Sequence, residues 1–141
     1  MVDKLEVTID VIIHATEDIS KFLKSFEDIF ELDNSFTVNE TLGHFENTIT
    51  ILSRKIEKKE AQKFVVKLIH SISKEQIIKL IEEIEERTVD SRLHIRLDKQ
   101  EFIKGNLVLS DRDAIKVKIH TPIYNKKDTV KIFRQVFQIA N

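Results

Sequence analysis

Cysteine is absent from the 141 residues, and glycine and proline are scarce, with two and one respectively. Without cysteine the chain can form neither disulfide bonds nor thiolate metal sites. Two glycines nearly exclude a glycine-rich loop that would hold nucleotide phosphates. No apolar run approaches the ~20 residues that span a bilayer, and the N-terminus lacks the basic-then-apolar pattern of a secretory signal. We therefore expect a cytoplasmic protein with no cofactor and no contact with a membrane.

Charge is abundant and unevenly distributed along the chain. Hydrophobic residues make up 41% and charged residues 33%, as in a soluble globular protein, and the length suits one domain, residues 1–141. Residues 1–90 hold 12 lysines and arginines against 19 acids, whereas residues 91–141 hold 11 against 5. The basic part predicts a surface that attracts polyanions. The alternative is that acidic helices and basic strands neutralise one another.

Alternating apolar and polar residues, the pattern of a half-buried strand, organise the second half of the chain. Within 93–100, we expect Leu93, Ile95 and Leu97 to face a core, and Arg96 to face water or a partner. Similar alternation predicts further strands at 7–13, 36–42, 49–56, 107–109 and 114–120.

Apolar residues spaced by three and four predict four helices. We expect them from Thr16 to near 32–34, over 58–72, from Ser73 onward, and after the turn at 125–128. The hydroxyls of Thr16 and Ser73 can accept hydrogen bonds from free backbone N–H groups at a helix start. Strands and helices are mixed without regular βαβ alternation, which predicts an α+β fold. The expected architecture is a two-layer sandwich of a mainly antiparallel sheet with helices on one face.

The last helix carries apolar residues around an unusually wide part of its surface. Val130, Phe133 and Phe137 form one stripe, and Ile132, Val136 and Ile139 extend it. Two interpretations are equally open. The helix contacts a second subunit, which predicts a homodimer, or it is deeply buried within its own chain.

Motifs for catalysis and metal binding are missing. There is no Gly-x-Ser-x-Gly elbow, and the five histidines lack the His-Glu-x-x-His spacing of a zinc site. The acidic run 82–86 fits a solvated helix face better than a metal site. Asp98, Lys99 and Glu101 fit a structural ion pair better than an acid–base cluster. We therefore expect no catalytic residue and no metal.

Three segments together resemble the archaeal exosome-associated-like RNA-binding proteins. They are His-Ala-Thr-Glu-Asp at 14–18, Gly-His-Phe-Glu-Asn-Thr-Ile at 43–49, and Leu-His-Ile-Arg-Leu-Asp-Lys-Gln at 93–100 with Lys-Gly at 104–105. The resemblance implies a fold similar to ribosomal protein L5 and a non-enzymatic, dimeric RNA-binding protein within an RNA-processing complex. Glu46 and Glu101 depart from the family pattern by adding carboxylates.

The leading functional hypothesis is binding of structured or double-stranded RNA through phosphate contacts. The residues expected to make these contacts are Arg54, Arg96, Lys99, Lys104, Lys116 and Lys118. Three of them, Arg96, Lys116 and Lys118, share a face if their strands are neighbours in register. Alternatively, these cations pair with nearby acids such as those at 82–86. The competing function is a non-catalytic dimeric scaffold or interaction module.

Overall fold

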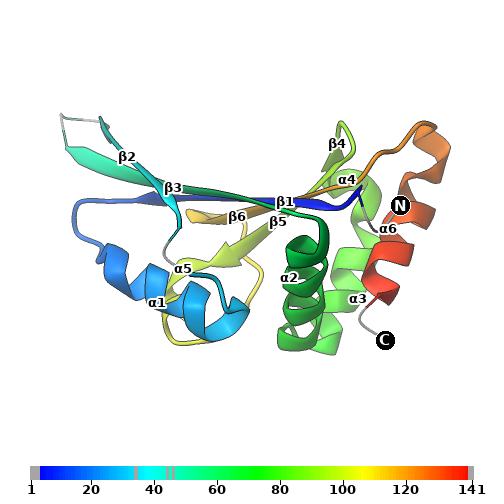
Figure 1. The fold of residues 1–141 in the computed structure, drawn as a ribbon, viewed down its shortest axis with the longest axis horizontal. Coiled ribbons are helices and arrows are strands. Elements are labelled where there is room, and N and C mark those ends of the chain that lie inside the picture. The colour runs from blue at the N-terminus through cyan, green and yellow to red at the C-terminus, as the bar shows by residue number, and fades with distance from the viewer. Residues whose placement is uncertain (1–3, 34, 44, 46, 140–141) are drawn as a thin grey trace.

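One antiparallel sheet runs through the molecule, and helices cover one of its faces (Figure 1). The computed structural model describes residues 4–33, 35–43, 45 and 47–139, so Asn34, His44 and Glu46 of the sequence expectations lie outside the described residues. The strands are β1 (Glu6–Ile13), β2 (Thr37–Leu42), β3 (Thr48–Glu57), β4 (Thr88–Val89), β5 (Arg92–Asp98) and β6 (Ala114–His120). The helices are α1 (Ile19–Phe30), α2 (Lys58–Ser71), α3 (Lys74–Glu82), α4 (Ile84–Arg87), α5 (Lys99–Ile103) and α6 (Thr129–Gln138), with a 3-10 turn, η3 (Lys126–Asp128). No helix in the described ranges is long and apolar enough to cross a membrane.

The strand order is β2-β3-β1-β6-β5-β4, and every neighbouring pair is antiparallel. Central strand β1 places Val7 opposite Ile56 of β3 and opposite Ile119 of β6. Helices α1 and α5 lie under one half of the sheet, and α2, α3 and α6 lie toward the other end (Figure 1). The predicted α+β class, with an antiparallel sheet and helices on one face, is confirmed.

Alternation in the sequence decides which strand residues form the core. β1 alternates half-buried and buried residues along its length, and Val7 and Ile9 are completely buried. In β5 the same alternation buries Leu93, Ile95 and Leu97, as predicted. Burying one such side chain contributes about 1.5–3 kcal/mol, so a strand that turned over would lose several of these contributions at once. The opposite face of each strand is therefore fixed as well.

Helix α1 begins two residues later than predicted. Asp18, and not Thr16, caps it, because the Asp18 carboxylate accepts from the Ser20 backbone N–H at 3.0 Å. Hydrogen bonds from the Ser20 hydroxyl and N–H hold the pKa of Asp18 below its ordinary value. The helix ends at Phe30, and Glu31 takes the left-handed conformation with φ of 57°.

Phenylalanines join the helices beneath the sheet. The Phe26 ring lies 4.8 Å from that of Phe36 and 4.6 Å from that of Phe102, measured between centroids. Phe30 stacks on Phe64 of α2 at 4.1 Å. These contacts connect α1 with α2, with α5 and with the segment that enters β2, and so fix the loops that surround the sheet edge.

The chain after β5 forms helix α5 and does not continue as a strand to residue 100. Asp98 ends the strand, and its carboxylate accepts from the Glu101 backbone N–H at 2.9 Å as a helix N-cap. The short helix buries Phe102 completely. Burial of this ring and the cap together explain why the alternating pattern stops at Asp98.

The predicted strand at 107–109 is reduced to an isolated bridge between Leu97 and Leu109. The Leu109 backbone N–H donates to the Gln76 side-chain oxygen at 2.6 Å, so a side chain replaces a strand partner. Gln76 lies in the first turn of α3, where its own N–H donates to the Ser73 hydroxyl at 3.3 Å. The predicted Ser73 cap is confirmed, but the Gln76 side chain bonds to Leu109 and not to the Ser73 N–H.

The third predicted helix is interrupted, and a short strand follows it. α3 ends at Glu82, α4 follows, and β4 pairs with the start of β5. Asp90 and Ser91, at φ of 50° and 64°, form the turn between β4 and β5, and two positive φ values suit a tight hairpin. Within the acidic run, Glu83 pairs with Arg87 at 2.8 Å.

Most of the apolar surface of α6 is covered by the chain itself. Phe133 is fully buried, and Ile132, Val136 and Phe137 are at most 9% exposed. Of the two interpretations of this helix, the structure shows burial within the same chain. Val130 and Ile139, at the margins of the stripe, are only partly buried.

Candidate nucleic-acid interface

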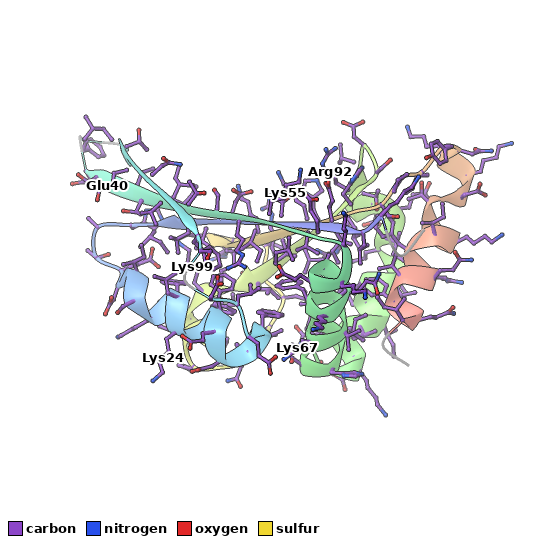
Figure 2. All side chains as sticks on the ribbon, in the orientation of Figure 1. Lys24, Glu40, Lys55, Lys67, Arg92 and Lys99 are labelled. Carbon is purple, nitrogen blue, oxygen red and sulfur yellow. The ribbon has the colours of Figure 1, made fainter. Side chains whose placement is uncertain are left out.

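The face of the sheet that carries no helices gathers cationic side chains from β5 and β6. In the β5–β6 pair, Arg96 lies opposite Lys116 and His94 lies opposite Lys118. Arg92 and Lys55 stand on the same side of the sheet, away from the helices (Figure 2). We call the five side chains on β5 and β6 the basic face: Arg92, His94, Arg96, Lys116 and Lys118.

The pKa of His94 reflects both its burial and the positive charges of the basic face. Its partial burial lowers the pKa of the imidazole, and the positive charges of the surrounding side chains lower it further. Those charges come from Lys118, Arg96, Arg92 and Lys116. Burial and the surrounding positive charges therefore both disfavour the charged form of this imidazole.

Acidic neighbours do not neutralise the basic face by direct pairing. Asp10 of β1 faces Lys116, but its carboxylate accepts from the Ser53 hydroxyl at 2.8 Å. Within the described part of the chain, Arg96, Lys116 and Lys118 make no hydrogen bond and no ion pair with a carboxylate. The alternative that these cations pair with residues 82–86 is therefore not what the structure shows.

A hollow of about 500 Å³ opens on this face, and we call it the basic hollow. Arg112, on the loop before β6, adds a fourth cation to Arg96, Lys116 and Lys118. Asp10, Asp111 and Asp113 also line it. The hollow thus offers several donors for an anion, with carboxylates that limit the net positive charge.

Arg54, one of the six predicted site residues, lies on the other side of the sheet. It is opposite Ile9 on the core-facing side of β3, its guanidinium pairs with Asp33 at 2.7 Å, and it lies over the Phe36 ring at 5.5 Å. Hydrogen bonds from Ser35 and Arg54 lower the pKa of Asp33 to about 2. The sequence signal was available, because Arg54 falls on the same alternate positions as buried Leu52 and Ile56.

Lys99 begins α5 and Lys104 follows its last residue, and neither lies on the basic face. Lys99 is only 4% exposed, and its ammonium donates to the Ile12 carbonyl. Lys104 is exposed, and its ammonium lies 3.6 Å from the Glu101 carboxylate. The structure therefore brings together Arg96, Lys116 and Lys118 but not Arg54, Lys99 and Lys104. Sequence reasoning overlooked Arg92 and Arg112, although Arg92 continues the alternation of His94 and Arg96.

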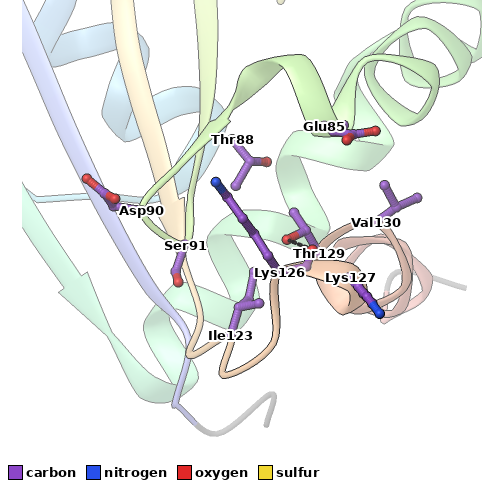
Figure 3. Close-up of a pocket in the computed structure, with 9 residues that line it drawn as sticks. All are labelled: Glu85, Thr88, Asp90, Ser91, Ile123, Lys126, Lys127, Thr129 and Val130. Atoms are coloured by element: carbon purple, nitrogen blue, oxygen red, sulfur yellow. Dashed lines mark hydrogen bonds between the residues drawn. The ribbon is translucent and has the colours of Figure 1, made fainter.

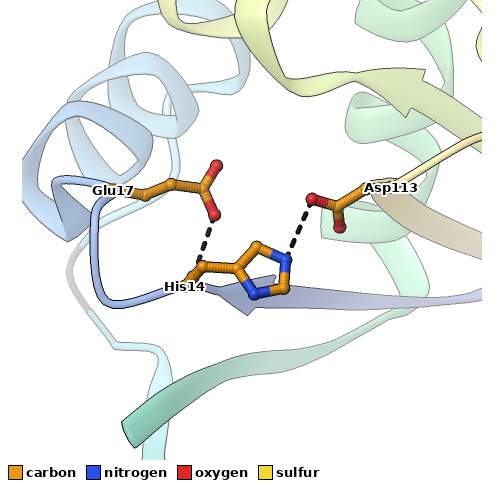
Figure 4. A group of neighbouring side chains, drawn as sticks. All are labelled: His14, Glu17 and Asp113. Atoms are coloured by element: carbon orange, nitrogen blue, oxygen red, sulfur yellow. Dashed lines mark hydrogen bonds and ion pairs between the residues drawn. The ribbon is translucent and has the colours of Figure 1, made fainter. Parts of the chain in front are cut away.

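Three potential metal ligands, His14, Glu17 and Asp113, lie together at the end of β1 (Figure 4). His14 Nε2 is 3.0 Å from Asp113, and the His14 backbone N–H donates to Glu17 at 2.9 Å. The Lys99 ammonium lies 3.1 Å from both carboxylates. A lysine thus supplies the positive charge that these acids require, and the cluster is an ion-pair network and not a metal centre.

This network predicts how stability depends on pH. Although burial raises the pKa of Asp113, the hydrogen bonds and charges of Lys99 and His14 together outweigh it, and the pKa lies below its ordinary value. A lowered pKa stabilises the fold above the unfolded-state pKa, and the contribution is lost as pH falls through the folded-state value. We expect Lys99→Met to lower the urea midpoint of unfolding at neutral pH. As the pH falls toward about 3, the midpoint of this variant should decrease less steeply than that of the unaltered protein. Exposed Lys104→Met is the control, and an equally steep acid decline in Lys99→Met would contradict the assignment.

Another hollow, of about 560 Å³, lies between the β4–β5 turn and the start of α6 (Figure 3). Lys126 points toward Thr88 of β4 and Asp90 of the turn, whereas Lys127 points away (Figure 3). Glu85 and Asp90 contribute carboxylates to the same lining. Both charge signs are mixed here, and none of the six predicted site residues takes part.

Comparison with known proteins assigns the chain to a family. A family model described as RNA binding matches residues 6–121, which run from the first residue of β1 to just beyond β6. An RNA-binding protein of Pyrococcus abyssi is 33% identical over 139 residues, which cover 92% of this chain and 90% of that protein. An uncharacterized protein of Methanocaldococcus jannaschii is 35% identical over 138 residues, with 89% and 91% covered.

Solved structures share the fold. The crystal structure of protein AF2318 from Archaeoglobus fulgidus has a TM-score of 0.81 at 25% identity, covering 93% of this chain and 97% of that one. A DUF54 protein from Methanothermobacter thermautotrophicus has a TM-score of 0.77 at 22% identity, covering 96% and 99%. Since the family model spans the whole sheet and two relatives align over most of their length, the chain belongs to this archaeal RNA-binding family.

Proposed function

We propose that the basic face binds the phosphate backbone of structured RNA, and that the protein is a non-catalytic accessory factor in archaeal RNA processing. The observation that carries the proposal is the register of β5 and β6, which sets Arg96 beside Lys116 with Lys118 two residues away. Membership of an RNA-binding family supports RNA as the polyanion. The Pyrococcus abyssi relative, described as an RNA-binding protein, supports the same choice.

The spacing of these cations suits a polyanion better than a single small anion. Neighbouring strands lie about 5 Å apart, and alternate residues on one strand lie about 7 Å apart. Arg96, Lys116 and Lys118 therefore form the corners of a grid that can contact several phosphates. Arg112, at the edge of the basic hollow, extends the grid toward the loop before β6.

The open face favours recognition of RNA shape over base sequence. Contacts to phosphates fix position and orientation but carry no sequence information directly. Double-stranded RNA is recognised mainly through its backbone and 2′-hydroxyl groups, because its deep major groove is closed to side chains. We therefore assign structured RNA as the ligand class and assign no catalytic role to any residue of the face.

The affinity of the unaltered protein for an RNA duplex, measured at two salt concentrations, tests the proposal. Each phosphate neutralised by a lysine or arginine releases counterions, so the affinity should fall steeply as salt rises. Duplexes of unrelated sequence should bind with similar affinity. Absence of binding at low salt would reject RNA as the ligand of this face.

The competing function is a dimeric interaction module, and the surface that best supports it is the free edge of strand β2. All six residues of β2 are exposed at the end of the sheet, and Val38 and Leu42 are 51% and 68% exposed. Exposed edge strands are templates for pairing with another chain.

We expect a dimer mass in light scattering at high concentration and a shift toward monomer in Val38→Lys. Ile78→Lys, an exposed isoleucine on α3, is the control, and a monomer mass for the unaltered protein would refute self-association.

A further inference from the structure

A further hollow, of about 550 Å³, adjoins the basic hollow on the same face of the sheet. Ile12 lines both hollows. Ile12 lies opposite Ile51, and Ile49 follows two residues away on the same side of β3. Three half-buried isoleucines therefore form a continuous apolar floor on a face that is otherwise polar. We call the hollow of about 550 Å³ the aromatic hollow, after the Phe45 ring at its rim.

Phe45 stands at the rim of the aromatic hollow, in the hairpin between β2 and β3. Its side chain is 95% exposed, although a phenylalanine ring is usually buried. Its φ is 57°, in the left-handed region that bulky residues rarely adopt. Gly43 closes the hairpin, since its N–H donates to the Asn47 carbonyl at 2.7 Å. Such a costly conformation, which keeps an aromatic ring in water, is typical of a ligand contact.

The composition of the aromatic hollow matches a nucleobase. An exposed aromatic ring offers a surface on which any base can stack. The apolar floor excludes water from the other side, and the Asn47 side chain offers both a donor and an acceptor for a base edge. The cations of the basic hollow, which is contiguous through Ile12, would hold the phosphates of the same strand.

We infer that the aromatic hollow receives one unpaired base of an RNA whose backbone lies on the basic face. The ligand is therefore a structured RNA with a single-stranded nucleotide at its end or in a bulge, and not a uniform duplex. This inference rests on the proposed function, because the basic face supplies most of the affinity. The base contact adds selectivity for the junction between paired and unpaired RNA.

Two RNAs distinguish the inference from the proposed function: a blunt duplex, and the same duplex with a short overhang that carries 2-aminopurine. We expect the unaltered protein to prefer the overhang by roughly tenfold, the usual scale for one base stacked on an aromatic ring, and to quench its fluorescence. Phe45→Ala should abolish the preference and the quenching but keep duplex binding, whereas Phe45→Trp should retain both. Leu42→Ala is the matched control, because Leu42 is an exposed apolar residue of the same hairpin on the opposite side of the sheet.

The outcomes separate the two claims. Equal affinity of the unaltered protein for both RNAs, or an unchanged preference in Phe45→Ala, would overturn the base site and leave the basic face standing. An equal loss of both RNAs in Phe45→Ala would also overturn it, because the ring would then support binding of paired RNA. If the unaltered protein bound neither RNA at low salt, both the basic face and the base site would be rejected.

Discussion

Replacing Arg96, Lys116 and Lys118 together by alanine is expected to reduce RNA affinity at low salt on the order of 100-fold. The loss should be similar for RNAs of different sequence, because phosphate contacts do not read bases. The slope of log affinity against log salt should flatten by about two to three units, close to one unit for each lost phosphate contact. Titration of labelled RNA by fluorescence anisotropy at several salt concentrations measures both quantities.

A matched triple variant separates a local effect from a change in net charge. Lys24, Lys63 and Lys79 are exposed on α1, α2 and α3, on the helix side of the sheet. Their replacement by alanine removes the same three charges far from the basic face. We expect this control to retain nearly all affinity and salt dependence. Equal losses in the two triple variants would show that RNA responds to overall charge and not to this surface.

Ile95→Asp is expected to unfold the protein or to make it aggregate. Ile95 is completely buried in the middle of β5, opposite Val117 of β6. A carboxylate at this position would lose its water without gaining a partner, which costs several kcal/mol. A loss of about 4 kcal/mol or more is comparable with the whole stability of a small domain, about 5–15 kcal/mol. Urea denaturation followed by circular dichroism measures the change.

The neighbouring residue gives the control for this substitution. Arg96 follows Ile95 in the chain but is exposed on the opposite side of the sheet. Arg96→Ala should therefore change the free energy of unfolding by no more than about 0.5 kcal/mol. Similar unfolding midpoints for Ile95→Asp and the unaltered protein would show that the faces of β5 are reversed.

The strand and helix patterns together were sufficient to predict the α+β class, and the alternation in β5 and β6 predicted which side of these strands faces solvent. A strand has a period of two, so each residue's face follows from its position as soon as one face is apolar. The same rule, applied strictly, assigns Arg54 to the side of Leu52 and Ile56. Lys99 lies just beyond the strand, in α5, where this rule no longer applies. Both residues are found on the core-facing side and neither contributes to the basic face.

Boundaries set by capping were predicted less well than strand faces. Asp18 and Asp98 each accept a backbone N–H and start a helix, at positions where the sequence pattern predicted another cap or a longer strand. Several polar residues in succession can cap a helix, and packing of the following side chains selects among them. Phe102 illustrates this selection, because its burial requires the chain to turn into α5 immediately after β5.

The sequence by itself determined which strand residues face the core and which face solvent, because alternation is a local property of the chain. Only the tertiary structure decided which cations become neighbours. The opposition of Arg96 and Lys116 depends on the register of two strands that a helix and a loop separate. The same holds for Lys99, whose charge is balanced by Glu17 and Asp113 from two other segments. The aromatic hollow likewise combines the end of β1 with the β2–β3 hairpin, and such long-range contacts leave no periodic trace in the sequence.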